Sequence, residues 1–85
     1  MKTAPQRSSV RLGVAIDNAY KQLAAAGVAS PRHDAETLAA FVIGCPRGRL
    51  LVAGDLSAGQ SAVFDKLIAR RASRVPLQHL TGSAA

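Results

Sequence analysis

The sequence has 85 residues, of which 48% are hydrophobic and only 4% aromatic. This length allows a single domain, and no apolar run approaches the roughly 20 residues that a membrane span requires. The net charge of +6 indicates either an acidic partner or a purely solubilising role. The single cysteine, Cys45, excludes an intrachain disulfide and fits the reducing cytoplasm in which we expect the protein to act.

The N-terminal part predicts a short tail followed by a helix. Residues 1–9 carry positive charge with no apolar stretch behind them, so they are expected to form a flexible tail rather than a secretory signal. Apolar residues then recur at spacings of three and four, which predicts a helix over about residues 10–26. This stripe consists of Leu12, Ile16, Ala19, Leu23 and Ala26. Gly27 follows, where a glycine commonly ends a helix.

Ser30 and Pro31 predict the start of a second helix. The Ser30 hydroxyl can accept a hydrogen bond from a free backbone N–H, and proline is favoured in the first turn. Asp34 and Glu36 lie near this start, where the helix dipole favours carboxylates. Gly44 should end the helix. The expected buried stripe is Ala35, Leu38, Ala39 and Val42, with Phe41 beside it.

Two further helices are predicted in the second half of the chain. A short one is expected over Arg47–Val52, between the Cys45-Pro46 and Gly54-Asp55 pairs. The spacing of Ser57 and Gln60 indicates a capping box, so a longer helix is expected from there to about Ser73. Its apolar stripe is Val63, Phe64, Leu67 and Ile68.

Pro76 should stop the last long helix, and the end of the chain reads as turn-like. No run of useful strand length is found. The sequence therefore predicts an all-α fold, a small bundle of four to five helices.

Motifs for chemistry are missing from the sequence. It has no glycine-rich phosphate loop between a strand and a helix. His33, Asp34 and Glu36 are adjacent, but they lack metal-ligand spacing, and His33 is interpreted as a solvated residue at a helix start. Cys45 would need His33 or His79 to act as a nucleophile, and a partly buried structural thiol is the favoured interpretation. We therefore predict no catalytic, cofactor-binding or metal-binding residue.

Basic residues are the remaining candidates for a functional surface. Those proposed to dock a partner are Arg47, Arg49, Lys66, Arg70, Arg71 and Arg74. Arg71 and Arg74 continue the stripe of the last long helix, so they could also lie over the core edge, and cations that suit the helix dipole are the alternative interpretation. Nucleic-acid binding is disfavoured, because Tyr20, Phe41 and Phe64 fall in or beside helix stripes and not on a stacking platform.

Three ordered stretches carry a family resemblance. They are S-P-R-H-D-A-E at residues 30–36, R-G-R-L-L at residues 47–51, and R-A-S-R-V-P-L-Q-H-L-T-G at residues 71–82. Together they resemble the N-terminal domain of the HemK/PrmC family of release factor glutamine methyltransferases. In that family a helical bundle precedes a connector with the pattern Pro-Leu-x-Tyr-x-x-Gly. The connector residues here are Pro76, Leu77, Gln78, His79 and Gly82, with His79 in place of tyrosine and Val75 where glutamate commonly precedes the proline.

The resemblance implies a role for the chain. Members of the family transfer a methyl group from S-adenosylmethionine to the glutamine of the Gly-Gly-Gln motif of peptide chain release factors, which act in translation termination. The family's cofactor and catalytic motifs belong to a following Rossmann-like domain and have no counterpart here, so the chain is expected to lack the catalytic domain.

The implied organisation is a substrate-recognition domain at residues 10–74 and the start of a connector at residues 75–85. The implied partners are release factors, which are in general acidic, and the C-terminal methyltransferase domain of the same protein. A basic helical nucleic-acid-binding module is the alternative, and an interaction domain without any enzyme attached is a third hypothesis.

Overall fold

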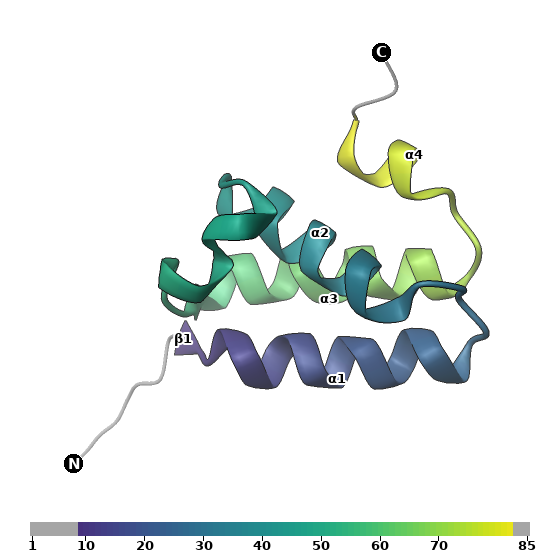
Figure 1. Cartoon of the computed structure of the whole chain (residues 1–85), viewed down its shortest axis with the longest axis horizontal. Helices are drawn as coiled ribbons and strands as arrows, with labels where there is room; N and C mark the ends of the chain where they lie inside the picture. The colour runs from purple at the N-terminus through teal and green to yellow at the C-terminus, as the bar shows by residue number, and fades with distance from the viewer. Residues whose placement is uncertain (1–8, 83–85) are drawn as a thin grey trace.

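The computed structural model describes residues 9–82, which form a small all-α bundle and so confirm the predicted fold class (Figure 1). Residues 1–8 of the expected tail and residues 83–85 of the expected connector lie outside the described residues. The elements are β1 (Ser9–Val10), α1 (Leu12–Ala25), α2 (Pro31–Ile43), the 3₁₀ helix η1 (Arg47–Val52), β2 (Leu56–Ser57), α3 (Ala58–Ala72) and α4 (Leu77–Thr81).

Helices α1 and α2 run antiparallel, and α3 packs behind them against both (Figure 1). The core is aliphatic, as the composition predicts, with Phe64 as its one buried aromatic side chain among the described residues. Its other members are Leu12, Ile16, Ala19, Leu23, Val28, Ala35, Leu38, Ala39, Ala40, Leu50, Leu56, Ile68 and Leu80. The abundance of alanine lets α1 and α2 approach closely, because a methyl side chain adds little bulk between two backbones.

Helix α1 starts two residues later than the periodicity predicts. Val10 pairs with Leu56 in an antiparallel two-residue ladder, β1 with β2, that the sequence did not indicate. This ladder ties the start of α1 to the start of α3. At the other end Gly27 has φ +82°, and the N–H of Val28 donates to the carbonyl of Leu23 at 3.0 Å. The predicted glycine stop is confirmed, and it has the hydrogen bonds of a Schellman motif.

Helix α2 begins at Pro31 and ends at Gly44, as predicted, but its N-cap differs from the expectation. Ser30 occupies the N-cap position without a side-chain cap hydrogen bond. Its ψ of 67° departs from the extended conformation that directs an N-cap side chain at the first turn. Ser57, with ψ 167°, has that conformation, and it forms the predicted capping box with Gln60.

The short helix η1 has the predicted bounds but is a 3₁₀ helix. Six residues with a glycine inside them favour this tighter form, which is common in connections. One expected stripe residue is wrong, because Val63 is 49% exposed, and Phe41, expected beside the stripe of α2, is 47% exposed. Phe41 follows the buried Ala40, and Val63 precedes the buried Phe64. A step of one residue turns the side chain by about 100° around the helix, so both side chains leave the buried side.

The end of the described chain is helical where the sequence predicted a turn. Residues Leu77–Thr81 form α4, which packs against α2 and α3. Leu77 and Leu80 lie three positions apart and therefore share a face. Leu80 is only 7% exposed, and Leu77 is partly buried against the same core. The segment expected to begin a connector is thus packed onto the bundle, while the boundary at residue 74 stays a prediction.

Candidate functional site

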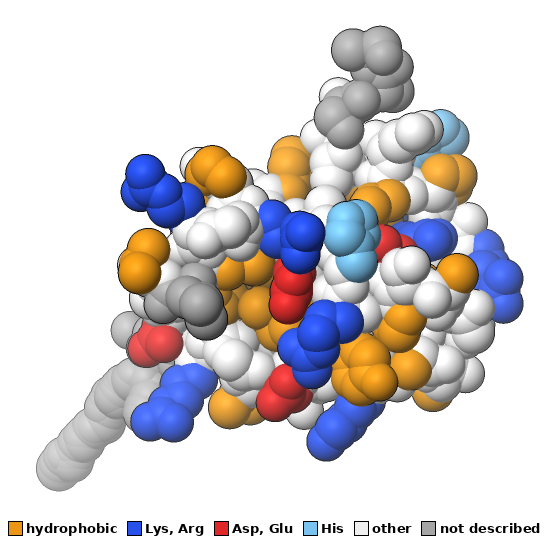
Figure 2. Space-filling model, in the orientation of Figure 1, with side chains coloured by type: hydrophobic (Ala, Val, Ile, Leu, Met, Phe, Trp, Pro, Cys, Tyr) orange, Lys and Arg blue, Asp and Glu red, His pale blue; other side chains and the backbone are white. Residues whose placement is uncertain are grey.

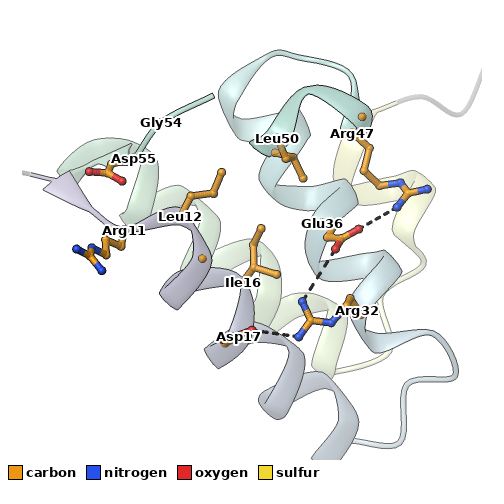
Figure 3. Close-up of a pocket in the computed structure, with 12 residues that line it drawn as sticks. Arg11, Leu12, Ile16, Asp17, Arg32, Glu36, Arg47, Leu50, Gly54 and Asp55 are labelled. Carbon is orange, nitrogen blue, oxygen red and sulfur yellow. Dashed lines mark hydrogen bonds and ion pairs between the residues drawn. The ribbon is translucent and has the colours of Figure 1, made fainter. Parts of the chain in front are cut away.

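A hollow in the surface lies between α1, α2 and η1 and has a volume of about 750 Å³ (Figure 3). Its apolar lining comes from Leu12 and Ile16, in the first two turns of α1, and from Leu50 of η1. Charged side chains form the rim: Arg11, Asp17, Arg32, Glu36, Arg47 and Asp55. Positive and negative groups are equal in number there, so the groove has no net charge.

Four of the rim residues form a chain of ion pairs. Arg47 Nη1 lies 2.8 Å from Glu36 Oε1, and Arg32 Nη2 lies 3.0 Å from Asp17 Oδ1, with Arg32 Nη1 4.0 Å from Glu36 Oε2. The Arg32 guanidinium also lies over the Tyr20 ring, 4.8 Å from its centroid. Figure 2 shows Lys/Arg and Asp/Glu side chains alternating across the middle of this face. Each exposed pair adds little stability, but together they link α1, α2 and η1.

Asp34 and Arg71 form a separate and more buried pair. Arg71 Nε donates to Asp34 Oδ2 at 2.9 Å, and the two side chains are 21% and 8% exposed. Arg71 Nη1 also donates to the carbonyl of Val75 at 3.2 Å, while His33 Nδ1 lies 3.3 Å from Asp34 Oδ1. The sequence explained Asp34 by the helix dipole alone. The structure adds a partner 37 positions away, which no local pattern could reveal.

The predicted docking residues fall in three places. Arg71 is half-buried in the pair with Asp34. Arg47 and Arg49 lie on η1, where Arg47 lines the groove and is paired with Glu36. The other three follow one helix: Lys66 and Arg70 are exposed on α3, and Arg74 lies just past its end. The structure therefore separates the candidates more than it gathers them.

Arg74 has an unusual backbone conformation. Its φ of +79° is left-handed, the only such value for a described residue other than glycine. The N–H of Val75 donates to the carbonyl of Arg70 at 3.1 Å, so Arg74 occupies the position of a Schellman motif that glycine normally fills. Its Nη2 donates to the carbonyl of Ala26 at 3.1 Å. Arg74 thereby ties the end of α3 to the end of α1.

The connector residues mark the bounds of α4. Pro76 is its N-cap, and Gly82, with φ +70°, is its C-cap. Gln78 and His79 are exposed, and Val75 is partly buried against the core.

Cys45 is a free, partly buried thiol, as expected. Within residues 9–82 no group of three His, Cys, Asp or Glu side chains could hold a metal ion, and no helix there is long and apolar enough to cross a membrane.

The described residues form a small helical bundle with a charged groove and several exposed basic side chains. The chain belongs to the family described as the PrmC N-terminal domain, whose model matches residues 15–82. Its relatives named release factor glutamine methyltransferase include those of Mycolicibacterium smegmatis, 55% identical over 75 residues, Streptomyces coelicolor, 48% over 69, and Mycobacterium leprae, 45% over 74.

These three alignments cover 88%, 81% and 87% of this chain but only 27%, 24% and 26% of the relatives. The chain thus spans about a quarter of the length of the curated relatives it matches. No solved structure gives a significant match. The predicted family is confirmed, and the relatives are methyltransferases by name.

Proposed function

We propose that this chain is the N-terminal domain of a release factor glutamine methyltransferase and that its helical bundle binds the protein substrate. The observation that carries the proposal is the family match over residues 15–82, together with the shared name of the relatives. The whole enzyme would methylate the glutamine of a release factor's Gly-Gly-Gln motif in the cytoplasm. The methyl donor would be S-adenosylmethionine.

The residues of the bundle suit docking. Delivering one glutamine side chain to a methyl donor requires positioning, and a second contact surface supplies it by orienting the substrate and raising its local concentration. The bundle is held across its helices by the Asp34–Arg71 pair and by Arg74 on the Ala26 carbonyl. A scaffold fixed in this way keeps its exposed side chains in constant relative positions, which a docking surface needs.

The described residues do not fit S-adenosylmethionine. A binding loop for such a cofactor in a Rossmann-like domain follows a strand and opens a helix. Here the glycines with positive φ are Gly27, Gly44, Gly54 and Gly82, and each lies at or just beyond a helix end. In the groove, Asp17 and Glu36 are already paired with arginines. The cofactor would therefore be bound by another part of the enzyme, and this domain would contribute the docking of the substrate.

The alternative, a basic nucleic-acid-binding module, rests on the net charge of +6 and on the short, helix-turn-helix-like spacing of the helices. The two described aromatic side chains that are exposed, Tyr20 and Phe41, lie on different helices. Arg32 covers Tyr20. No pair of them forms a platform on which bases could stack.

A titration separates these two functions. The fluorescently labelled chain is mixed with a purified release factor and, in parallel, with single-stranded and duplex RNA at low and moderate salt. Saturable binding of the release factor supports the proposal. Binding of RNA alone, with a steep loss of affinity as salt rises, would overturn it in favour of the alternative.

A further inference from the structure

We propose that the solvent-facing side of α3 is the docking surface of this domain and that its occupant is the acidic face of a helix on the partner protein. This inference rests on the proposed function, because it names the surface and the chemistry of the partner for the same docking role. We call this surface the α3 face. It consists of Gly59, Ala62, Val63, Lys66, Ala69, Arg70 and Ser73, all exposed.

The α3 face carries mostly short side chains, which leaves it open to close approach. Phe64 and Ile68 fix the opposite side of the helix in the core, so the exposed side points away from α1 and α2. Around Lys66 and Arg70 the exposed neighbours are short side chains, Ala62 and Ala69 among them. Helices pack with their axes about 8–10 Å apart, and the shorter distances need small residues at the contact. A partner helix can therefore lie along α3 without displacing bulky groups.

The charge of the α3 face is positive and unpaired. The ion pairs of the described residues engage Arg32, Arg47 and Arg71, together with His33, but neither Lys66 nor Arg70. Lys66 and Arg70 are four positions apart, which brings their side chains to the same side of the helix, roughly 6 Å apart at Cβ. Arg74 continues the positive charge past the helix end.

The acidic residue of α3, Asp65, lies at the edge of this face. It follows Ala62 by three positions and precedes Ala69 by four, and it lines a small cavity together with Asn18 and Gln22 of α1. The groove differs from the α3 face in its net charge. The charges of the groove cancel, and two of its carboxylates are paired with arginines. Long-range attraction of an acidic partner thus favours the α3 face over the groove.

A second copy of the chain does not fit this surface. Two α3 faces in contact would place Lys66 and Arg70 against like charges. The described helices also present no two free carboxylates one turn apart, since those of Asp17, Asp34 and Glu36 are already paired and Asp65 is the single acidic residue of α3. Nucleic acid would gain no stacking there, because no described residue of the α3 face is aromatic. Carboxylates spaced one turn apart on a partner helix match Lys66 and Arg70 in both sign and spacing.

Two double variants with equal net charge test the inference. Lys66→Glu/Arg70→Glu alters the α3 face, and Arg11→Glu/Lys21→Glu alters exposed cations at the N-cap and in the middle of α1. Each changes four units of charge and lowers +6 to +2. We expect the first to weaken release factor binding by about ten-fold or more, and the second by no more than about two-fold. Equal weakening by both, or a larger effect of the second, would overturn the inference.

A steric pair tests the same surface without changing charge. Ala69→Trp should block the approach of a partner helix, whereas Ala24→Trp, on an exposed position of α1, should leave the dissociation constant unchanged. Thermal unfolding of all four variants checks that each is folded. Unchanged binding by the α3 variants would overturn this inference alone, while failure of the wild-type chain to bind a release factor would count against the proposed function. If the α3 variants weaken the binding of RNA and leave the binding of the release factor unchanged, the inference is overturned as well.

Discussion

Arg71 donates from Nε to the carboxylate of Asp34 at 2.9 Å and from Nη1 to the carbonyl of Val75 at 3.2 Å. One guanidinium thus joins α3, α2 and the segment that leads into α4. Because Asp34 is only 5% exposed, its charge is largely removed from water. The pair therefore acts as a single unit. Removing one partner should lower the free energy of unfolding far more than removing both.

The first prediction concerns this pair. Arg71→Met leaves a buried carboxylate without its cation and should lower the free energy of unfolding by about 3–5 kcal/mol. The double variant Asp34→Leu/Arg71→Met removes both charges and should recover much of that loss. Urea unfolding of the wild type, both single variants and the double variant measures the coupling. Additive losses in the double variant would contradict the account.

The second prediction concerns the left-handed backbone of Arg74. Arg74→Ala loses the hydrogen bond to the Ala26 carbonyl and keeps the backbone strain, so it should lower stability by about 1 kcal/mol. Arg74→Gly loses the same bond but relieves strain of about 1–2 kcal/mol, and it should be close to the wild type. The difference in melting temperature between the two variants measures the strain directly. Identical melting temperatures would show that φ +79° carries no cost.

The third prediction compares two serine caps. Ser57 Oγ accepts from the N–H of Gln60 at 3.1 Å, so Ser57→Ala should cost about 1 kcal/mol. Ser30 occupies an N-cap without a side-chain bond, and Ser30→Ala should change stability by less than about 0.5 kcal/mol. The two variants serve as controls for each other in urea unfolding. A larger loss from Ser30→Ala would mean that the roles of the two serines are reversed.

Local signals in the sequence predicted the parts of the fold that local chemistry decides. Pro31 begins α2, Gly27 and Gly44 end α1 and α2, and Ser57 with Gln60 caps α3, all as the sequence indicates. A periodic stripe also identifies the buried side of α1 well, because that helix packs along one face.

Relationships between distant segments could not be predicted in this way. The pairing of Val10 with Leu56 and of Asp34 with Arg71 depends on where the helices come to lie. The same holds for α4, whose five residues gain a helical conformation by packing Leu80 into a core that the rest of the chain provides. Of the docking candidates, Arg71 lies three positions after buried Ile68 and so on the inner side of α3. Lys66 and Arg70 lie on the outer side of α3. Helical periodicity in the sequence is enough to distinguish these two residues from Arg71.

The fourth prediction concerns α4. Leu80 is 7% exposed within the core cluster, so Leu80→Ala should lower the free energy of unfolding by about 2–4 kcal/mol. Leu77→Ala, at a partly buried position of the same helix, should have a smaller effect. Hydrogen exchange of the α4 amides gives a second readout. Exchange as fast as in an unfolded peptide would contradict the packed position of this helix.

The central claim, that this chain is the substrate-docking domain of a release factor glutamine methyltransferase, is tested most directly in a chimera. The segment of the Mycolicibacterium smegmatis relative that aligns with this chain, at 55% identity over 75 residues, is replaced by the corresponding residues of this chain. The kcat/KM for methylation of a release factor is then measured beside the intact relative and a version without the segment. The account predicts that the chimera keeps most of the activity of the intact relative, and that Lys66→Glu/Arg70→Glu raises its KM. Activity no higher than that of the version without the segment would contradict the account.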